Sequence, residues 1–264
     1  MACPSFMPRL RLVTFNIAHG RGLTPIQGFT SARKLRLNLR GIAALLERHA
    51  PDIVAGQEVD EWSRWAGNFD HLDYLRIHAR FKEAVFGINN RRKGLLNLCY
   101  GNALLSRHPI LHAETVVFGQ RSLGEKGFLF AEIDLGGGCV VPVVNLHLHF
   151  SSRAQRLGQI DRLLAWLRDQ HRLRASKWSV MPIVCGDFNT PSTGDDATAS
   201  LLSHLLDYGD YGLHPHLTPT YPSPLPQRAL DFIFLPAGCR LTSCHVLKTL
   251  LSDHRPVMVE MEIG

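Results

Sequence analysis

Short apolar runs of strand length recur along the whole chain, and this recurrence limits the fold more than any other feature of the sequence. Runs such as RLVTFNIA, PDIVAGQEV, CVVPVVNLHLHF, MPIVCGDFN and RPVMVEMEI each end near a turn residue or a polar residue, which is typical of strands. Helical spacing of apolar residues is confined to two segments, 35–46 and 157–167. Strands therefore outnumber helices, and the sequence predicts an α/β fold of mixed sheets with helices packed outside them.

The chain carries no feature that would divide it. Its 264 residues fit one large α/β unit, and we find no internal repeat, low-complexity tract or long linker. Hydrophobic residues make up 45% and charged residues 20%, a balance that argues against disorder. The segment DLGGGCV predicts a hairpin turn rather than a phosphate-binding loop, because a strand follows it. We therefore expect a single domain, 1–264.

Charge and cysteine content bear on partners and compartment. The net charge of +6 and the pI of about 9.2 make an anionic partner plausible without naming it. None of the six cysteines forms a C-x-x-C pair, and a chain of this length can build a core without disulfides. The first residues contain no apolar signal-peptide region, and no apolar stretch is long enough to span a membrane. We expect a cytoplasmic protein without membrane insertion, and no protein partner is indicated.

Polar residues gather at the ends of the predicted strands. Each of them alone has an ordinary structural explanation, since Asp and Asn favour turns and a lone His near a strand is commonly structural. As a set they supply carboxylates, amides and imidazoles, which suit Mg²⁺ or Mn²⁺ and phosphoryl transfer rather than a zinc site. The set comprises Asn16, Glu58, His147, Asp187, Asn189, Asp231, Asp253 and His254.

The order of motifs around these residues is specific. TFNI, QE, GNALLS, NLHL, GDFN, LDFIF and SDHRPV follow one another from Thr14 to Val257. This order resembles the endonuclease/exonuclease/phosphatase superfamily, the DNase I-like metal-dependent phosphoesterases. The resemblance implies a four-layer α/β sandwich, with two mixed β-sheets packed face to face and helices outside. It also implies an active site where the loops at the strand ends converge.

On the metal side, the resemblance makes Glu58 of QE the principal ligand of Mg²⁺ or Mn²⁺. Asn16 of TFNI and Asp253 of SDH would complete the metal's shell, directly or through water. Whether one metal or two would bind stays open.

On the phosphate side, Asp187 would orient or deprotonate the attacking water, and Asn189 would hold that water or a second metal. His254 would contact a non-bridging phosphate oxygen, while Asp231 would hydrogen-bond His254 and keep it protonated. His147 would supply another donor. Because alternate residues of a strand point to one side, we expect Asp187 and Asn189 of GDFN to face one phosphate together. The general base is either Asp187 or His254.

The substrate is less well defined than the reaction. We predict a phosphodiesterase with nuclease-type chemistry, in which water attacks phosphorus in line. A diester is favoured over a monoester because the residues of the motifs include no Lys or Arg. The alternatives are a lipid or small-molecule phosphoesterase, similar to sphingomyelinases or inositol phosphatases, and a non-catalytic binding module. The binding module is disfavoured because every motif residue is present.

A few further residues could contact the substrate. The net positive charge slightly favours nucleic acid, and Arg91 and Arg92 in the loop NNRRKG would then grip its flanking phosphates, unless this loop is only a solvated surface. Asn102 of GNALLS is a weaker candidate for substrate contact. Trp62 and Trp65 would either line a substrate wall or pack within a loop.

Overall fold

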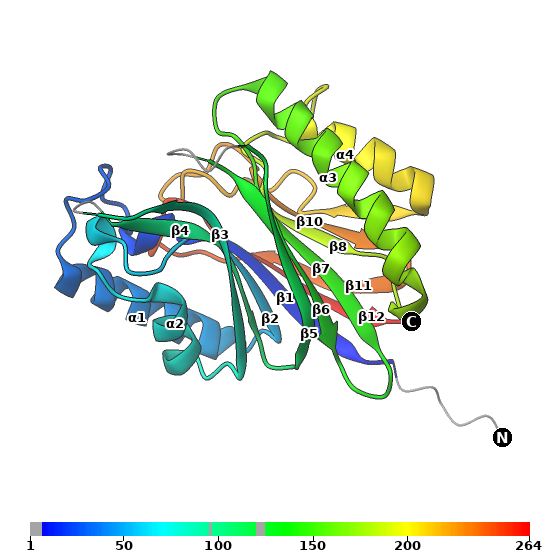
Figure 1. The fold of residues 1–264 in the computed structure, drawn as a ribbon, viewed down its shortest axis with the longest axis horizontal. Helices are drawn as coiled ribbons and strands as arrows, with labels where there is room; N and C mark the ends of the chain where they lie inside the picture. Colours follow the sequence, from blue (N-terminus) through cyan, green and yellow to red (C-terminus); the bar gives the residue numbers. More distant parts are fainter. Residues whose placement is uncertain (1–6, 95–96, 120–124) are drawn as a thin grey trace.

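The computed structural model describes residues 7–94, 97–119 and 125–264, and in these residues the chain forms two six-stranded sheets that pack face to face (Figure 1). The first sheet has the order β11-β12-β1-β2-β4-β3, from Cys239–Val246, Val257–Ile263, Arg9–Asn16, Ile53–Asp60, Leu98–Ser106 and Glu83–Arg92. The second has the order β5-β6-β7-β8-β10-β9, from Ile110–Val117, Gly127–Asp134, Val140–His147, Ile183–Asp187, Asp231–Pro236 and Tyr211–His214.

Each sheet contains one parallel pair, β1 with β2 and β7 with β8, while the other neighbours are antiparallel. A parallel pair needs a crossover connection, and the two segments with helical spacing supply it. They form α1 (Ala32–His49) and α3 (Arg153–Arg174), which begin after Ser31 and Ser152, each of which accepts a bond from a backbone N–H of the first turn. The predicted mixed sheets and both predicted helices are therefore confirmed.

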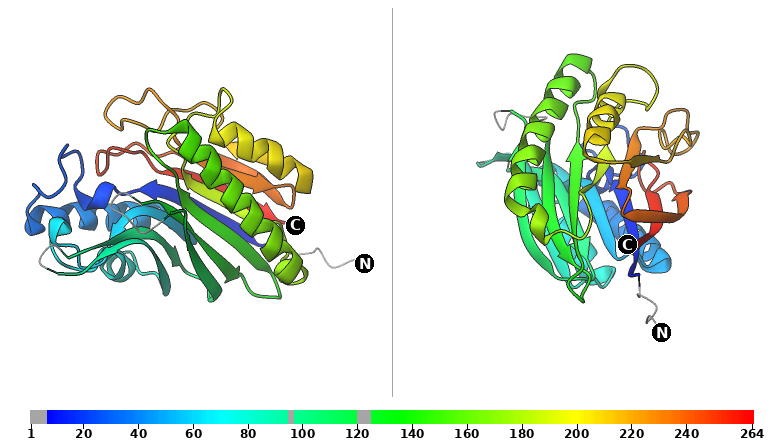
Figure 2. Two further views of the ribbon diagram at one scale, coloured as in Figure 1. Left: turned by 45° about the horizontal axis from the view of Figure 1, so that its top comes forward. Right: turned by 90° about the vertical axis from the view of Figure 1, so that its right-hand side faces the viewer.

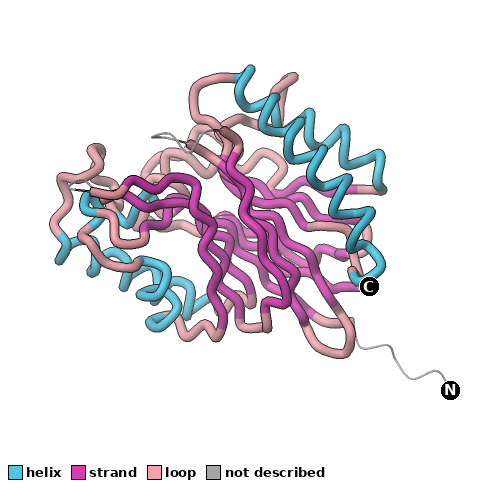
Figure 3. Tube along the Cα trace, viewed as in Figure 1, coloured by secondary structure: helices cyan, strands magenta, loops and turns pink. Residues whose placement is uncertain are grey.

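The remaining helices are short. α2 (His71–His78) follows β2, and α4 (Ala197–Leu205) follows β8. Helices cover the outer faces of the sheets, as Figure 3 shows in cyan. Single 3₁₀ turns complete the described elements: η1 (Ala18–Gly20), η2 (Arg64–Ala66), η3 (Ala175–Lys177) and η4 (Leu206–Tyr208).

Alternation along the strands divides the core into layers. On β1, Leu12 packs between the two sheets, whereas Val13 packs against α1 and α2, since successive side chains point to opposite faces. On the second sheet, Phe128 and Phe232 pack outward against α3 and α4. The two views in Figure 2 show the resulting order of helices, sheet, sheet and helices. The predicted four-layer sandwich is confirmed.

A buried polar layer joins the sheets beneath one end. Gln57 Nε2 donates to Asn145 Oδ1 at 2.7 Å, and Asn145 Nδ2 donates to the carbonyl oxygens of Gly56 and Ala103 at 2.9 Å. Buried polar groups with satisfied partners tolerate little displacement. These contacts therefore hold β2 and β4 of the first sheet in fixed relation to β7 of the second.

The structure also bears on the predicted hairpin turn and on the apolar character of the helices. The segment DLGGGCV connects β6 to β7, and Leu135 N–H donates to Cys139 O at 2.9 Å, so the predicted hairpin turn is present. Among the described residues, no helix combines the length and the apolar character needed to cross a bilayer.

Candidate active site

A cleft of about 360 Å³ opens at the end of the sandwich where β1, β7 and β8 finish. In Figure 1, β1 runs from the side of the N-terminus toward this end. The lining residues come from both sheets and from the loops between them. They are Asn16, Arg21, Glu58, Lys126, His147, Phe150, Asp187, Asn189, Tyr221, Arg228, Leu230, Asp253 and His254.

Strand register places three of the predicted residues in one row across the second sheet. His147 pairs with Asp187 between parallel strands β7 and β8, and Asp231 pairs with Asp187 between β8 and β10. Asp187 and His147 line the cleft, while Asp231 is fully buried behind it. The three residues are far apart in sequence, but they are adjacent in space because β7, β8 and β10 are neighbours in the sheet.

His254 completes this group from the loop before β12. Its Nδ1 lies 2.9 Å from Asp231 Oδ2, so the predicted Asp231–His254 hydrogen bond is present. Its Nε2 lies 3.7 Å from Asp187 Oδ2. Burial opposes the charged ring, but the carboxylates of Asp231 and Asp187 outweigh it and raise the pKa of His254 to about 10. His254 is therefore an imidazolium at neutral pH.

At Asp187, the effect of burial outweighs the interactions that favour the ionised carboxylate. Burial raises its pKa above the ordinary value, and the charge of Asp231 adds to this, while His254 and a hydrogen bond from Asn16 act against it. A carboxylate with a raised pKa is a stronger base once it is ionised. Asp187 is thus suited to accept a proton near neutral pH, whereas the charged His254 is not.

The explanation by strand alternation for Asp187 and Asn189 was wrong. β8 ends at Asp187, and Asn189 has a left-handed backbone with φ of 54°, which Asn adopts more readily than most residues. Asn189 N–H donates to Asp187 Oδ1 at 2.9 Å, and Asn189 Nδ2 donates to Leu148 O at 3.0 Å. GDFN is therefore a turn closed by its own aspartate, and this turn brings both side chains to the cleft.

On the opposite wall, Glu58 is aimed into the cleft by a bulge. The pairing of β2 with β4 shifts register between Gly56 and Val59, and Glu58 has φ of 54°. Bulges redirect side chains and occur frequently beside active sites. Burial raises the pKa of this carboxyl, but the charges of His19, Lys126 and other basic groups dominate and hold it well below its usual range.

Asn16 and Asp253 line the same cleft as Glu58. Asn16 Nδ2 donates to Asp187 Oδ2 at 2.9 Å, which links the two sheets across the cleft. Asp253 Oδ2 accepts from Arg21 at 2.8 Å. Glu58 and Asp253 offer carboxylate oxygen atoms, each with a basic side chain nearby. Asn16 offers an amide oxygen, which also accepts a single bond from the Ala18 N–H at 2.9 Å. Such a donor set fits Mg²⁺ or Mn²⁺.

A second acidic cluster has a different character. Ligand atoms of Asp187, Asp231 and His254 lie within 4.8 Å of one another. However, Asp231 Oδ2 already accepts bonds from His254 and from Thr220 Oγ1, the latter at 2.6 Å. We interpret this group as a hydrogen-bonded set rather than as a metal site.

The cleft is lined by three cationic residues that were not predicted as site residues, namely Lys126, Arg21 and Arg228. Lys126 directly precedes Gly127, which pairs with His147, so register sets the lysine beside the histidine, with Nζ 2.9 Å from His147 Nε2. Burial and the Lys126 charge together hold the pKa of His147 well below its usual range. Arg21 lines the same cleft. The predicted preference for a diester considered only the residues of the motifs and therefore left these cations out.

The structure does not bring the weaker candidates to the cleft. Asn102 is fully buried, and its Nδ2 donates to the carbonyl oxygens of Gly127 and Asn145, so it belongs to the polar layer between the sheets. Arg91 and Arg92 lie at the end of strand β3 and not in the predicted loop. Arg91 NH2 pairs with Glu61 at 2.6 Å, and neither arginine lines the cleft. These positions do not support the predicted substrate contacts.

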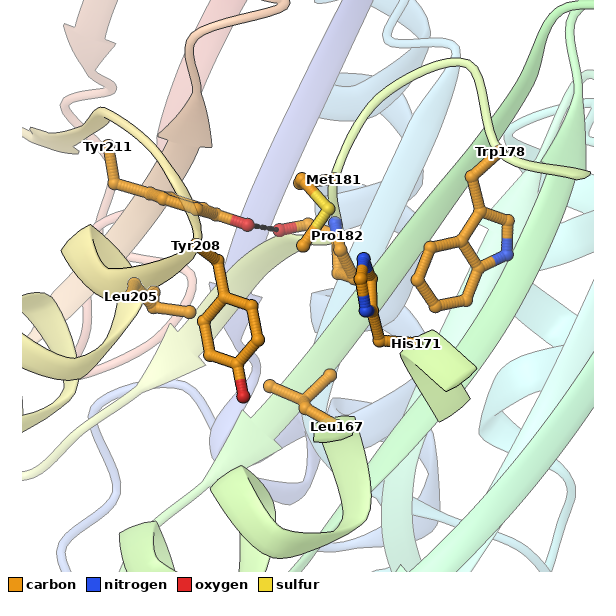
Figure 4. Close-up of a pocket in the computed structure, with 8 residues that line it drawn as sticks. All are labelled: Leu167, His171, Trp178, Met181, Pro182, Leu205, Tyr208 and Tyr211. Atoms are coloured by element: carbon orange, nitrogen blue, oxygen red, sulfur yellow. Dashed lines mark hydrogen bonds between the residues drawn. The ribbon is translucent and has the colours of Figure 1, made fainter. Parts of the chain in front are cut away.

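A separate crevice lies beneath α3 and α4 (Figure 4). Its volume is about 10 Å³, which holds one water at most. The hydroxyl of Tyr211 is turned to a backbone partner, Pro182 O, at 2.9 Å. This crevice is a packing gap of the outer core. Its lining consists of Leu167, His171, Trp178, Met181, Pro182, Leu205, Tyr208 and Tyr211.

Comparison with known proteins agrees with this geometry. Residues 13–254 match the family described as the Endonuclease/Exonuclease/phosphatase family. No curated protein sequence matches the chain significantly.

Solved structures of the same fold are distant in sequence. An endonuclease/exonuclease/phosphatase from Beutenbergia cavernae has a TM-score of 0.75 at 19% identity, covering 97% of this chain and 72% of the other. A mannosyl-6-phosphatase from Bacteroides thetaiotaomicron has 0.71 at 15%, covering 96% and 99%. A sphingomyelinase C from Streptomyces griseocarneus has 0.65 at 20%, covering 97% and 100%. At these identities the likeness concerns the fold alone.

Proposed function

The chain belongs to the endonuclease/exonuclease/phosphatase family, and on this basis we propose that it is a Mg²⁺- or Mn²⁺-dependent hydrolase of phosphate diesters. One observation carries the proposal. A buried Asp187, flanked in register by His147 and Asp231, faces the carboxylates of Glu58 and Asp253 across a single cleft. Such a cleft has a base on one wall and hard oxygen ligands on the other.

In this proposal Glu58, Asp253 and Asn16 hold the metal. When bound, the metal supplies Lewis-acid polarisation of a phosphoryl oxygen. The bond from Asn16 to Asp187 keeps the metal side and the base side at a fixed separation. That separation matters because a water and a phosphate must be positioned between them.

The other residues act on protons and on oxygen charge. Asp187 takes a proton from the attacking water, since its raised pKa suits a base and His254 is already charged. His254 Nε2–H and Lys126 Nζ donate to phosphate oxygens as negative charge develops on them. His147, kept neutral beside Lys126, adds a further hydrogen-bonding group to the same wall.

A phosphate monoester is the second candidate, and the position of Lys126 favours it. A monoester dianion needs more positive charge than a diester, and Lys126 and Arg21 supply some. We favour the diester because carboxylates offset the positive charge of these two residues: Arg21 pairs with Asp253 at 2.8 Å, and Lys126 Nζ lies 3.8 Å from Glu58 Oε1. Nucleic acid remains the first diester to test because of the net charge of +6; a phospholipid is the alternative.

A matched pair of chromogenic substrates tests the reaction class. We expect the enzyme with Mg²⁺ to hydrolyse bis(4-nitrophenyl) phosphate faster than 4-nitrophenyl phosphate, and EDTA to stop both reactions. Asp187→Asn is the inactive control, because the amide cannot accept the proton of the water. Full turnover after metal removal would refute the metal-dependent mechanism, and a preference for the monoester would favour the second candidate.

Natural substrates are then compared directly. Single-stranded DNA, RNA and phosphatidylcholine vesicles are incubated with Mg²⁺ and with either wild type or Asp187→Asn. Cleavage of an oligonucleotide by wild type alone would support the nucleic-acid proposal. Cleavage of the lipid alone would replace nucleic acid with a lipid substrate and leave the chemistry unchanged.

A further inference from the structure

His19 is the buried neighbour of Glu58, and no sequence motif pointed to it. Its Nε2 lies 3.4 Å from Glu58 Oε2, and its Nδ1 lies 2.6 Å from Asp60 Oδ2. We propose that Asp60, His19 and Glu58 form a positioning chain, in which His19 fixes the carboxylate of Glu58 for the metal. This inference rests on the proposed role of Glu58 as a metal ligand.

The backbone at both ends of the contact is unusual. Glu58 has φ of 54° in its bulge, and His19 has φ of 53° within the 3₁₀ turn η1. A left-handed backbone is unfavourable for a residue with a side chain, and such strain concentrates at functional sites. Here the side chains of the two left-handed residues approach each other to 3.4 Å.

The ring of His19 is held from behind. Asp60 is fully buried, and its second oxygen, Oδ1, accepts from Trp65 Nε1 at 2.8 Å. The rings of Trp65 and Tyr100 stand edge-on to the imidazole, with centroids 5.2 and 5.4 Å away. A ring with a hydrogen-bonded Nδ1 and two aromatic walls has one orientation, which directs Nε2 at Glu58.

His19 differs from the residues that would touch metal or substrate. It is absent from the described lining of the cleft, whereas Glu58 and Lys126 are part of it. His19 is therefore placed to act on the reaction through Glu58 rather than by contact with the substrate. Partners of metal-binding carboxylates fix the orientation of the ligand, and their loss typically weakens metal binding about 10–100-fold.

Metal affinity without substrate is the direct test. Mn²⁺ binding to the full chain is titrated by the loss of the free-ion electron paramagnetic resonance signal. We expect His19→Ala to raise the Mn²⁺ dissociation constant about 10–100-fold. Trp65→Phe should raise it less, because this variant keeps His19 and an aromatic ring and loses only the hydrogen bond to Asp60. His19→Gln should recover most of the affinity, since its amide N–H can still reach Glu58.

His71→Ala is the matched control. His71 is also fully buried near this site, but its Nε2–H donates to the backbone oxygen of Ala66 at 2.8 Å rather than to Glu58. We expect it to lower the unfolding temperature and to leave Mn²⁺ affinity unchanged. Equal affinity losses in His19→Ala and His71→Ala would overturn the inference, because they would indicate a general loss of packing.

A reference variant separates the two levels of the proposal. If Glu58→Gln binds Mn²⁺ like wild type, the proposed metal site itself is wrong. If Glu58→Gln loses affinity and His19→Ala does not, only the positioning role of His19 is refuted. Circular dichroism confirms that each variant is folded; if His19→Ala is not, a Trp65→Phe variant with wild-type affinity refutes the chain of contacts.

Discussion

Replacement of Asp231 by asparagine isolates the charge of the Asp231–His254 pair. Asp231 Oδ2 accepts from His254 Nδ1 at 2.9 Å and from Thr220 Oγ1 at 2.6 Å. The other oxygen, Oδ1, is buried and has no hydrogen-bond partner in the described part of the chain. An amide oxygen in the Oδ2 position keeps both bonds, and the amide nitrogen takes the place of Oδ1. The substitution therefore preserves shape and removes a negative charge.

The size of the effect follows from the geometry. Two unit charges about 4 Å apart interact by about 4 kcal/mol at an effective dielectric constant of about 20. One pH unit corresponds to about 1.4 kcal/mol, so loss of the Asp231 charge should lower the pKa of His254 by about three pH units. The wild-type pKa is about 10, which places that of the variant at roughly 7.

The assay is the pH dependence of kcat/KM on bis(4-nitrophenyl) phosphate. If the reaction needs protonated His254, activity falls as pH rises through its pKa. The alkaline limb should therefore move from near pH 10 in wild type to roughly pH 7 in Asp231→Asn. Coincident alkaline limbs would refute the idea that Asp231 keeps His254 charged. Full additivity of Asp231→Asn with His254→Gln would also count against the pair acting as a unit.

Stability supplies an independent check of the same pKa. His254 has a folded-state pKa of about 10, above the ordinary value of 6.5. Its charge therefore stabilises the fold fully below pH 6.5, and this contribution is lost as pH rises toward 10. In metal-free protein, the difference in unfolding temperature between wild type and Asp231→Asn should be largest near pH 6 and should shrink toward pH 10. A difference that does not vary with pH would contradict the charged state of His254.

Three further substitutions test the remaining assignments. Lys126→Met should lower kcat about 10²–10³-fold, as expected when a donor to developing oxyanion charge is lost, without lowering the unfolding temperature; a near-normal kcat would remove Lys126 from the mechanism. Asn102→Ala should lower the free energy of unfolding in urea by about 1–3 kcal/mol, since two buried carbonyl oxygens lose their donor, and a selective rise in KM would instead indicate substrate contact. The double substitution Arg91→Ala and Arg92→Ala should leave the salt dependence of oligonucleotide binding unchanged. If the slope of log affinity against log salt concentration instead becomes flatter by about one per lost contact, these arginines do contact phosphates as first predicted.

Features that depend on a short stretch of chain were predictable from the sequence. The apolar spacing in residues 35–46 and 157–167 is the inward stripe of α1 and α3, because a helix repeats within its own sequence. The predicted strand-end residues gather for a similar reason. A polar side chain that interrupts an apolar run lies where the strand leaves the core, and parallel pairs β1/β2 and β7/β8 bring such ends together.

Features that depend on strand register were not predictable in this way. Lys126 reaches the cleft because Gly127 pairs with His147, two residues that no local pattern connects. The bulge that aims Glu58 exists only in the pairing of β2 with β4. The turn at Asn189 depends on its own bond to Asp187, which competes with the continuation of the strand. The positions of Lys126, Glu58 and Asn189 are each determined by contacts that no local sequence pattern predicts.

The charge of the cleft is therefore a property of the fold rather than of its motifs. The motifs supply Glu58, Asp187 and Asp253, and taken alone they describe an acidic site. Arg21 and Lys126 come from stretches outside the quoted motifs and face two of these carboxylates. A bound divalent cation would compete with both for the same oxygen atoms, which would leave Arg21 and Lys126 free to contact the substrate. The preference between diester and monoester thus depends on metal occupancy, so the two nitrophenyl substrates should be compared at several Mg²⁺ concentrations. A relative preference for the monoester that grows with Mg²⁺ would show that released cations recognise the substrate, and a constant ratio would show that they stay paired with their carboxylates.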